Sequence, residues 1–321
     1  MTSSTPATPE ADATVGIDIG GTKIAAAVVD RRGRLSHRSE VSTPASEGPD
    51  AILDAAAELA SRVAAAAGIR PNRFGVGSAG AFDERGRVVH ATDHLTGWAG
   101  TDAAAGLERR LDAHAIVVND VHAAALGELW SGGAADLHRF LFVAVGTGIG
   151  GAAVTGSRVV RGASGMAGSV GHVRIVSPRR RVCSCGGIDH VEAFASGPGI
   201  ERTYLEFTGR SRGLRDIARL GRDGDVVAAE VIRRAAEELG ESLAAAVTLF
   251  DAGVVVLGGG VSGVGELFTA PLASRLRAEL PSPFSTVAVR PAILGGDAAL
   301  LGAGGLALRV DAGEPYSSFF V

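Results

Sequence analysis

Residues 15–30 of the chain read VGIDIGGTKIAAAVVD, two short apolar runs joined by a glycine turn. The first run contains an acid, Asp18, and this order predicts a strand, a tight turn and a second strand. Because glycine has no Cβ, such a turn lets the backbone approach a ligand, and its N–H groups can surround an anion. A carboxylate beside it suits Mg²⁺ held together with phosphate, although a plain hairpin with an acid at its edge has the same pattern. The turn consists of Gly20, Gly21, Thr22 and Lys23.

Composition limits the possible classes of protein. The 321 residues are 46% hydrophobic and include 46 glycines, which is enough for two domains with many tight turns. A net charge of -4 gives no basic footprint for nucleic acid, and no apolar stretch reaches the roughly 18 residues of a membrane span. Residues 1–14 lack the features of a signal peptide, so we expect a disordered tail and a cytoplasmic protein. The two cysteines form no disulfide framework, which indicates a reducing compartment.

The apolar pattern alternates between strands and helices, which predicts an α/β fold. The polar stretch 211–224 is expected to be a connection, and Asp225 is expected to cap the helix that follows it. Helices are expected at 49–67, 107–114, 122–130, 201–207, 225–250, 265–280 and 297–310. Strands are expected at 35–42, 74–77, 87–90, 115–118, 140–145, 152–155, 254–257 and 286–291, besides the first hairpin.

A polar pair, Asn119 and Asp120, follows the strand expected at 115–118 and precedes a helix. In open α/β sheets, ligands bind at the carboxyl ends of strands, where helix starts also offer free N–H groups. Asn and Asp also often cap the N-terminus of a helix without contacting any ligand. The local pattern therefore leaves two interpretations open, a ligand-facing carboxylate and a structural cap.

The glycine turn recurs at residues 146–151, between the strands expected at 140–145 and 152–155. Two such hairpins predict an internally duplicated architecture with a phosphate held between two lobes. The turn also matches G-x-G-x-x-G, but a dinucleotide site needs a helix next and an acid roughly 20 residues on. No Asp or Glu occurs between Gly151 and Asp189, so we reject that interpretation. A third cluster, at 258–260, follows an apolar run and predicts close approach to a nucleotide's base and ribose.

A non-periodic segment, residues 162–187, offers a set of metal-binding side chains together with His190. Two imidazoles and two thiols suit tetrahedral zinc in a closed structural site. A disulfide between cysteines one residue apart is geometrically awkward. The same side chains could also be satisfied without a metal. The candidate ligands are His172, Cys183, Cys185 and His190.

Taken together, these motifs resemble the ROK family of repressors and sugar kinases, within the actin-like, hexokinase-type ATPases. The resemblance runs from about Val15 to Val310. It implies a duplicated actin-like (RNase H-like) architecture of two lobes with a cleft between them. The N-terminal lobe would be 15–119, joined by the returning helix 297–310, and the C-terminal lobe 120–296, with a zinc loop at 162–192. The matching strings are GIDIGGTKIAAAVVD, VVNDVHAAALGE, VAVGTGIGGA, GH at Gly171-His172, CSCGG, VEAFASG and VVVLGGGV.

The resemblance also implies roles for individual positions. Asp120 would be the catalytic base that takes the proton of a sugar hydroxyl, and His172 would both bind zinc and touch sugar. The other expected sugar contacts are Gly80, Asn119, Ser169 and Glu192. The first phosphate motif would be Asp18, Gly20, Gly21, Thr22 and Lys23. The second would be Gly146, Thr147, Gly148 and Gly150, and the adenosine motif would be Gly258, Gly259 and Gly260.

Two positions depart from the family's pattern. Sugar kinases of the family usually carry Glu where Ser169 stands, and losing a charged acceptor worth roughly 1.5–3 kcal/mol would change sugar preference or weaken binding. His190 stands where a third Cys is usual, and imidazole remains a competent zinc ligand.

The implied function is an ATP- and Mg²⁺-dependent kinase for a hexose or N-acetylhexosamine, with glucose as the first choice, structural zinc and a homodimer. The alternative is a non-catalytic sugar sensor. A repressor of this family would carry a helix-turn-helix domain ahead of the kinase-like part, and only 14 residues precede Val15 here.

Overall fold

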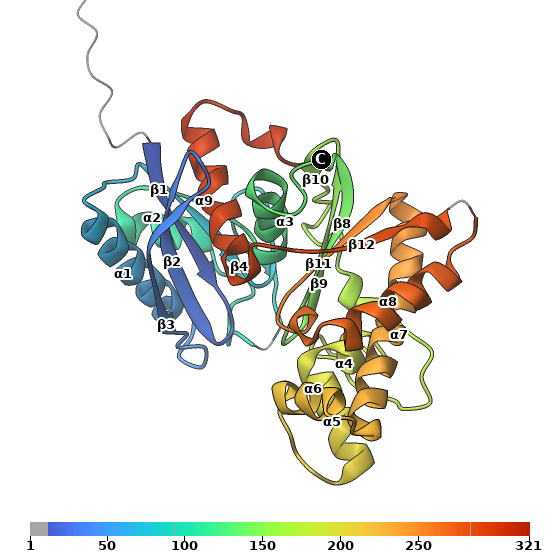
Figure 1. The fold of residues 1–321 in the computed structure, drawn as a ribbon. Coiled ribbons are helices and arrows are strands. Elements are labelled where there is room, and N and C mark those ends of the chain that lie inside the picture. The colour runs from blue at the N-terminus through green and yellow to red at the C-terminus, as the bar shows by residue number, and fades with distance from the viewer. Residues whose placement is uncertain (1–11, 93, 283) are drawn as a thin grey trace, which may run out of the picture. The chain divides into compact units, whose positions relative to one another are not determined.

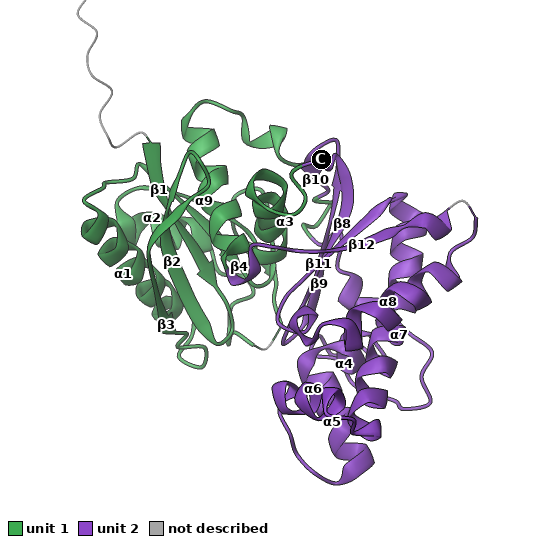
Figure 2. Cartoon of the chain, in the orientation of Figure 1, with its two compact units in different colours: residues 1–135, 161–165, 297–321 green, residues 136–160, 166–296 purple. Residues whose placement is uncertain are grey.

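The computed structural model describes residues 12–92, 94–282 and 284–321. Most of the expected N-terminal tail, residues 1–11, lies outside the described residues. The chain forms two compact units (Figure 2). Unit 1 consists of Met1–Ala135, Arg161–Gly165 and Asp297–Val321. Unit 2 consists of Asp136–Val160 and Met166–Gly296.

Unit 1 contains a five-stranded sheet in the order β3-β2-β1-β4-β7 (Figure 1). The hairpin predicted at 15–30 is confirmed: β1 and β2 pair antiparallel on either side of the glycine turn. β3 continues the antiparallel part, whereas β4 and β7 lie parallel to β1 and to each other. The strands are β1 Ala13–Ile19, β2 Lys23–Asp30, β3 Leu35–Ser42, β4 Arg73–Ser78 and β7 His114–Asn119. A small two-stranded sheet is formed by β5 Ala81–Phe82 and β6 Val88–His90.

Helices cover both faces of this sheet, because successive residues of a strand point to opposite sides. Odd-numbered β1 residues such as Val15 and Ile17 are fully buried in one cluster with apolar side chains of α1 and α2. The other face, which includes Gly16, packs against α9. Gly68 ends α1 in the left-handed conformation and donates its N–H to carbonyls of the last turn. The helices of unit 1 are α1 Pro49–Ala67, α2 Ala103–Leu111, α3 Asp120–Ser131 and α9 Ala298–Asp311.

Glycines bring the backbone of α9 into direct contact with its neighbours. A Cβ built on Gly302 would lie 1.7 Å from the carbonyl oxygen of Ala123 in α3. Cβ atoms built on Gly16 of β1 and Gly75 of β4 would lie 2.3 and 1.8 Å from α9 carbonyl oxygens. α9 is therefore fixed against the sheet and against α3 at a separation that no larger residue permits.

Unit 2 repeats this topology, which confirms the predicted duplication. Its sheet has the order β10-β9-β8-β11-β12, with an antiparallel part from β10 to β8 and parallel partners in β11 and β12. The second glycine turn joins β8 to β9, so a strand follows it, as the rejection of a dinucleotide site required. The strands are β8 Arg139–Val145, β9 Ile149–Thr155, β10 Arg158–Val159, β11 Val254–Gly258 and β12 Ala288–Pro291.

The core of unit 2 lies between one face of its sheet and a group of helices, of which α7 is the longest. Alternate β8 residues, Leu141, Val143 and Val145, point into this core. Asp225 caps α7 as predicted, with its carboxylate accepting from the N–H of Ala228 at 2.9 Å. The helices are α4 Glu192–Ala195, α5 Gly197–Thr208, α6 Leu214–Arg222, α7 Val226–Phe250 and α8 Glu266–Glu279. None of the helices in the described ranges is both long and apolar enough to cross a membrane.

Some element boundaries differ from expectation, and side-chain caps explain two of them. Asp102 caps α2, which therefore begins at Ala103 rather than at 107. Ser196 caps α5, which therefore begins at Gly197 rather than at 201. The expected connection 211–224 contains α6, a charged helix that buries only Ile217 and Ala218. β12 begins at Ala288, two residues later than expected, after a short 3₁₀ turn.

The first boundary between compact units also lies elsewhere along the chain. The sequence analysis separated the lobes after Asn119, whereas unit 1 continues to Ala135. The physical reason is the packing of α3 on α9, where Gly127 and Gly302 allow the two backbones to touch.

The close contact at the glycines of α9 predicts that one Gly→Ala substitution destabilises the protein, although such a change inside a helix usually stabilises. Gly→Ala inside a helix ordinarily stabilises by about 0.5–1 kcal/mol. Gly302→Ala should instead destabilise unit 1 by about 3 kcal/mol, because the new methyl group meets a backbone carbonyl that cannot move aside. Urea unfolding measures the difference. The control is Gly296→Ala, where a built Cβ meets nothing within 4 Å. Equal stability of the two variants would contradict the packing described.

Candidate active site

Three parallel strands of unit 1 bring the predicted polar residues to one edge of the sheet. In register, Asp18 of β1 lies beside Gly77 of β4, which lies beside Val118 of β7. One residue further, Asn119 ends β7 and Asp120 begins α3. A Cβ built on Gly77 would lie 3.4 Å from the Cα of Asp120. Glycine at this position therefore leaves the space between the two carboxylates free of a side chain.

The two polar residues at the end of β7 have different roles: Asn119 caps α3, and Asp120 presents a carboxylate. Asn119 is the cap of α3, because its Oδ1 accepts from the N–H of His122 at 3.0 Å. Its amide nitrogen donates to the carbonyl of Gly80 at 2.9 Å and to Oδ1 of Asp120 at 3.1 Å. The N–H of Val121 donates to the same Oδ1 at 2.9 Å. One carboxylate oxygen of Asp120 is thus fixed by two donors.

Hydrogen bonds from Thr43 to two carbonyl groups hold the first glycine turn in place. The hydroxyl of Thr43 donates to the carbonyl of Gly20 at 2.7 Å, and its N–H donates to that of Thr22 at 3.0 Å. The N–H of Gly20 donates within the turn to Lys23. The ammonium of Lys23, predicted to contact phosphate, pairs with Glu40 at 3.1 Å on an exposed surface.

Burial raises the pKa of both acids, and the charge of Asp120 adds to the effect on Asp18. The pKa of Asp18 is raised from 3.8 to about 7, first by burial and then by the charge of Asp120, with Lys23 and Arg38 acting in the opposite direction. Burial also raises the pKa of Asp120, against the hydrogen bonds from Val121 and Asn119. Two carboxylates that resist ionisation in the absence of a cation form an arrangement suited to binding one.

In unit 2 the second and third glycine clusters lie side by side. Gly258 pairs with Ala144 across β11 and β8, so both strands end together. A Cβ built on Gly259 would lie 2.4 Å from the carbonyl oxygen of Val145, and its φ of 84° also favours glycine. The carbonyl of Gly146 accepts from the N–H of Gly197 at 2.8 Å, which links this turn to the start of α5.

Glu192 connects the second glycine turn to the cysteine loop. Its buried carboxylate accepts from the N–H of Ile149 at 2.8 Å and from the hydroxyl of Ser184 at 2.5 Å. The thiol of Cys183 lies 3.4 Å from the same carboxylate. A Cβ on Gly148 would come within 2.7 Å of it. The structure thus gives Glu192 a bridging position.

Ser169 and His172 bound a short 3₁₀ turn, Val170–His172. The hydroxyl of Ser169 donates to the carbonyl of Met166 at 2.6 Å, so the short side chain folds back on its own loop. A Cβ on Gly171 would lie 2.0 Å from the carbonyl oxygen of Ile149, so the turn lies directly against β9.

The four predicted metal ligands come together. One potential ligand atom from each of His172, Cys183, Cys185 and His190 lies within 4.8 Å of the others. The thiol of Cys185 is 3.1 Å from Nδ1 of His190, and that of Cys183 is 3.8 Å from Nδ1 of His172. Burial raises the pKa of Cys183 to about 12 in the metal-free protein. Two imidazoles and two thiols at this separation fit a tetrahedral zinc ion.

The sequence analysis missed several residues that hold the site together. Thr43 anchors the first turn, and Ser184 anchors Glu192. The buried guanidinium of Arg181 donates to the carbonyls of Ala193 and Gly199. Only Ser184 carried a signal, since it lies between the two cysteines.

Comparisons with known proteins agree with these motifs. The sequence matches the ROK family over residues 14–310. The N-acetylmannosamine kinase of Escherichia coli O7:K1 is 35% identical over 296 residues, 92% of this chain and 98% of that protein. The glucokinase of Streptomyces coelicolor is 32% identical over 320 residues, 93% of this chain and 98% of that protein. A solved ROK family glucokinase from Streptomyces griseus, in complex with glucose and AMPPNP, is 34% identical and aligns with a TM-score of 0.82 over 92% of this chain and 99% of its own.

The raised pKa of Asp18 predicts a pH-dependent effect of its removal. Between about pH 4 and pH 7 the folded protein retains a proton that the unfolded chain releases, so Asp18 reduces stability as the pH rises through this window. Asp18→Asn removes that loss. The free energy of unfolding of the variant minus that of wild type should be at least about 1 kcal/mol larger at pH 8 than at pH 4, without Mg²⁺ or nucleotide.

Urea unfolding at both pH values measures this gain. The control is Asp30→Asn, because hydrogen bonds from Arg34 and Arg32 lower the pKa of Asp30. Its stabilising effect is present above its unfolded pKa and is lost only as the pH falls below about 4 through its folded pKa, so this variant should show no comparable gain between pH 4 and pH 8. A gain of equal size in both variants would refute the electrostatic account of Asp18.

Proposed function

The chain belongs to the ROK family, and we propose that it is an ATP- and Mg²⁺-dependent kinase that phosphorylates a hydroxyl of a hexose or N-acetylhexosamine. The observation that carries the proposal is the presentation of Asp120 at the end of β7 with one carboxylate oxygen fixed by two donors. The sugar class is inferred from relatives named glucokinase and N-acetylmannosamine kinase. Glucose remains our first choice of substrate.

We assign the role of general base to Asp120. With Oδ1 fixed by the Val121 N–H and the Asn119 amide, Oδ2 is the oxygen left to accept the proton of a sugar hydroxyl. Burial raises the pKa of this carboxyl, which makes it a stronger base once ionised. The amide of Asn119 and the carbonyl of Gly80 are held together and are assigned to sugar contacts.

Asp18 and the first glycine turn are assigned to the phosphates of ATP. The N–H of Gly20 is used within the turn, and Thr43 holds the carbonyl groups of Gly20 and Thr22, so we assign the other N–H groups of the turn to the anion. Asp18 lies where a cation would lower its pKa and ionise it. When bound there, Mg²⁺ would neutralise the developing charge on the phosphates.

Residues of unit 2 are assigned to the remaining parts of the substrates. We assign the turn of Gly146, Thr147, Gly148 and Gly150 to phosphate, and the cluster of Gly258, Gly259 and Gly260 to adenosine. Glu192 and His172 are assigned to sugar hydroxyls. The carboxylate of Glu192 holds both the second glycine turn and the cysteine loop, so it would also align these two segments with the sugar.

A non-catalytic sugar sensor is the second candidate, and Ser169 is the observation that favours it. The hydroxyl folds back onto Met166, so this position offers no charge to a sugar. A sensor would bind one sugar without consuming ATP, whereas a kinase would consume ATP only with its sugar. The proposed homodimer rests on the family alone, and the proposed cytoplasmic location rests on the cysteine usage of the sequence.

Replacing the base tests the proposal directly. Asp120→Asn should lower the rate of sugar phosphorylation at least about 100-fold, the usual scale of general-base catalysis, and leave sugar binding measurable. A coupled assay for ADP and calorimetry with sugar measure the two quantities. The control is Asp112→Asn, an exposed residue at the end of α2 whose left-handed φ Asn tolerates. Full activity of Asp120→Asn would refute the assignment.

The metal cluster predicts a stoichiometric zinc content. Purified protein should contain about one zinc per chain by elemental analysis, with tetrahedral nitrogen and sulfur ligands by X-ray absorption. His190→Ala should lose most of this zinc and lower the thermal stability of the protein. The control is His138→Ala, an exposed histidine in unit 2 outside the cluster. A stable wild-type preparation free of zinc would contradict the site.

A further inference from the structure

The chain continues beyond the last helix and packs back onto unit 1. We define the C-terminal tail as residues 312–321; the family match ends at 310. Figure 1 shows it in red, leaving the end of α9 and running to the C-terminus. Phe319 and Phe320 are 5% and 8% exposed, so the tail has its own buried anchors.

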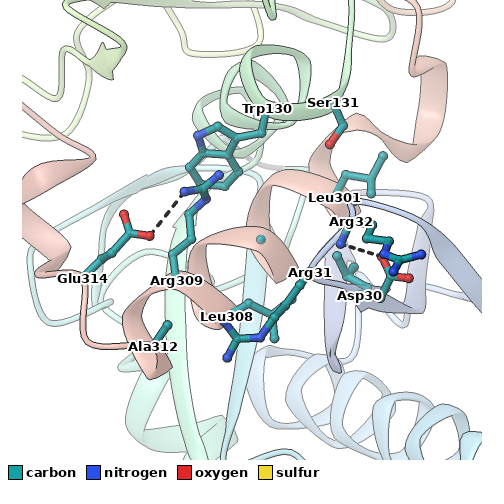
Figure 3. Close-up of a pocket in the computed structure, with 13 residues that line it drawn as sticks. Asp30, Arg31, Arg32, Trp130, Ser131, Leu301, Leu308, Arg309, Ala312 and Glu314 are labelled. Atoms are coloured by element: carbon teal, nitrogen blue, oxygen red, sulfur yellow. Dashed lines mark hydrogen bonds and ion pairs between the residues drawn. The ribbon is translucent and has the colours of Figure 1, made fainter. Parts of the chain in front are cut away.

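One anchor contacts the C-terminal end of α3. The ring of Phe319 lies edge-on to the indole of Trp130, with ring centroids 5.7 Å apart. The guanidinium of Arg309 lies 4.7 Å from the same indole and pairs with Glu314 of the tail at 3.3 Å (Figure 3). Trp130 is therefore held by the tail and by α9 together.

Other anchors reach the N-terminal end of α3. Tyr316 and Phe320, with rings 4.8 Å apart, line a nearly filled cavity of about 10 Å³ together with Asn119 and His122. Burial raises the pKa of Tyr316 to about 12, so its phenol stays uncharged there. Asn119 is the residue whose amide holds Asp120.

A backbone hydrogen bond closes the arrangement. The carbonyl of Val321 accepts from the N–H of Arg161 at 2.8 Å. The guanidinium of Arg161 donates to the carbonyl of Phe82 at 2.9 Å, and both residues line the same small cavity. The tail is thus fixed at its end as well as by its aromatic rings.

We propose that the C-terminal tail is a positioning element for the reaction: it holds α3 near both ends and so fixes Asn119 and the carboxylate of Asp120. α9 meets α3 through the rigid contact at Gly302 and Ala123, and the tail supplies contacts that α9 does not make. This inference rests on the proposed kinase function. The consequence is that the tail sets the turnover rate, although two of its aromatic anchors line a cavity with Asn119 and do not reach the predicted base itself.

The double variant Phe319→Ala, Phe320→Ala tests the tail. We expect kcat to fall about 10–100-fold, the scale of an ångström-sized misplacement of a catalytic group. KM for ATP should stay within about twofold, because the first glycine turn is anchored separately by Thr43. Phe319→Leu, Phe320→Leu should recover most of the lost kcat, since leucine keeps apolar bulk at both positions.

Two control variants separate positioning from general stability. Ser317→Ala alters an exposed tail residue and should leave kcat unchanged. Val63→Ala removes buried volume from α1, on the other face of the sheet, and should lower the melting temperature while sparing kcat. A kcat loss in Val63→Ala equal to that in the double variant would overturn the proposal.

The fluorescence of Trp130 reports on the tail independently of activity. Release of Phe319 should expose this indole and shift the protein's emission to longer wavelength in the double variant, since the second tryptophan, Trp98, is fully buried in the cluster with α1 and α2. If the shift appears while kcat stays unchanged, or if no shift appears, the positioning role is refuted. If the shift appears but the wild-type protein phosphorylates no sugar, the proposed function fails and the tail contact stands.

Discussion

The backbone contact between α9, α3 and the first sheet is the constraint on which the rest of unit 1 depends. Glycines on β1, β4, α3 and α9 let the backbones meet directly at the three places where α9 crosses β1, β4 and α3. Such contacts permit little sliding, because carbonyl oxygens and not flexible side chains meet the neighbouring chain. They fix the start of α3 relative to the ends of β1 and β4, and with it the distance between Asp120 and Asp18.

That fixed distance has an electrostatic cost, which accounts for the chemistry of the site. Burial and, second, the charge of Asp120 raise the pKa of Asp18 to about 7, although β4 lies between the two strands that end at these carboxylates. This arrangement adds no stability in the absence of a cation. A divalent cation bound beside the first glycine turn would favour the ionised carboxylates and reverse this balance.

Local sequence patterns predict much of the fold. The features that they do not predict depend on contacts between residues far apart in the sequence. The hairpins, the start and end of α1 and the cap of α7 all came from glycine, proline and aspartate at specific positions. The four candidate metal ligands were selected from residue type, and the fold brings them together. The bridging position of Glu192 could not be predicted, because Ile149 lies 43 residues away in the chain. The docking of Phe319 on Trp130 had no local signal either.

We propose that this chain transfers the γ-phosphate of ATP to a sugar hydroxyl. Mass spectrometry of reactions with Mg²⁺, ATP and a panel of glucose, mannose, fructose and N-acetylated hexosamines tests this transfer. We expect one or more of these sugars to gain the mass of a phosphoryl group, with one ADP formed per phosphorylated sugar. The proposal fails if ADP forms without any phosphorylated sugar, or if ATP is not consumed with any member of the panel.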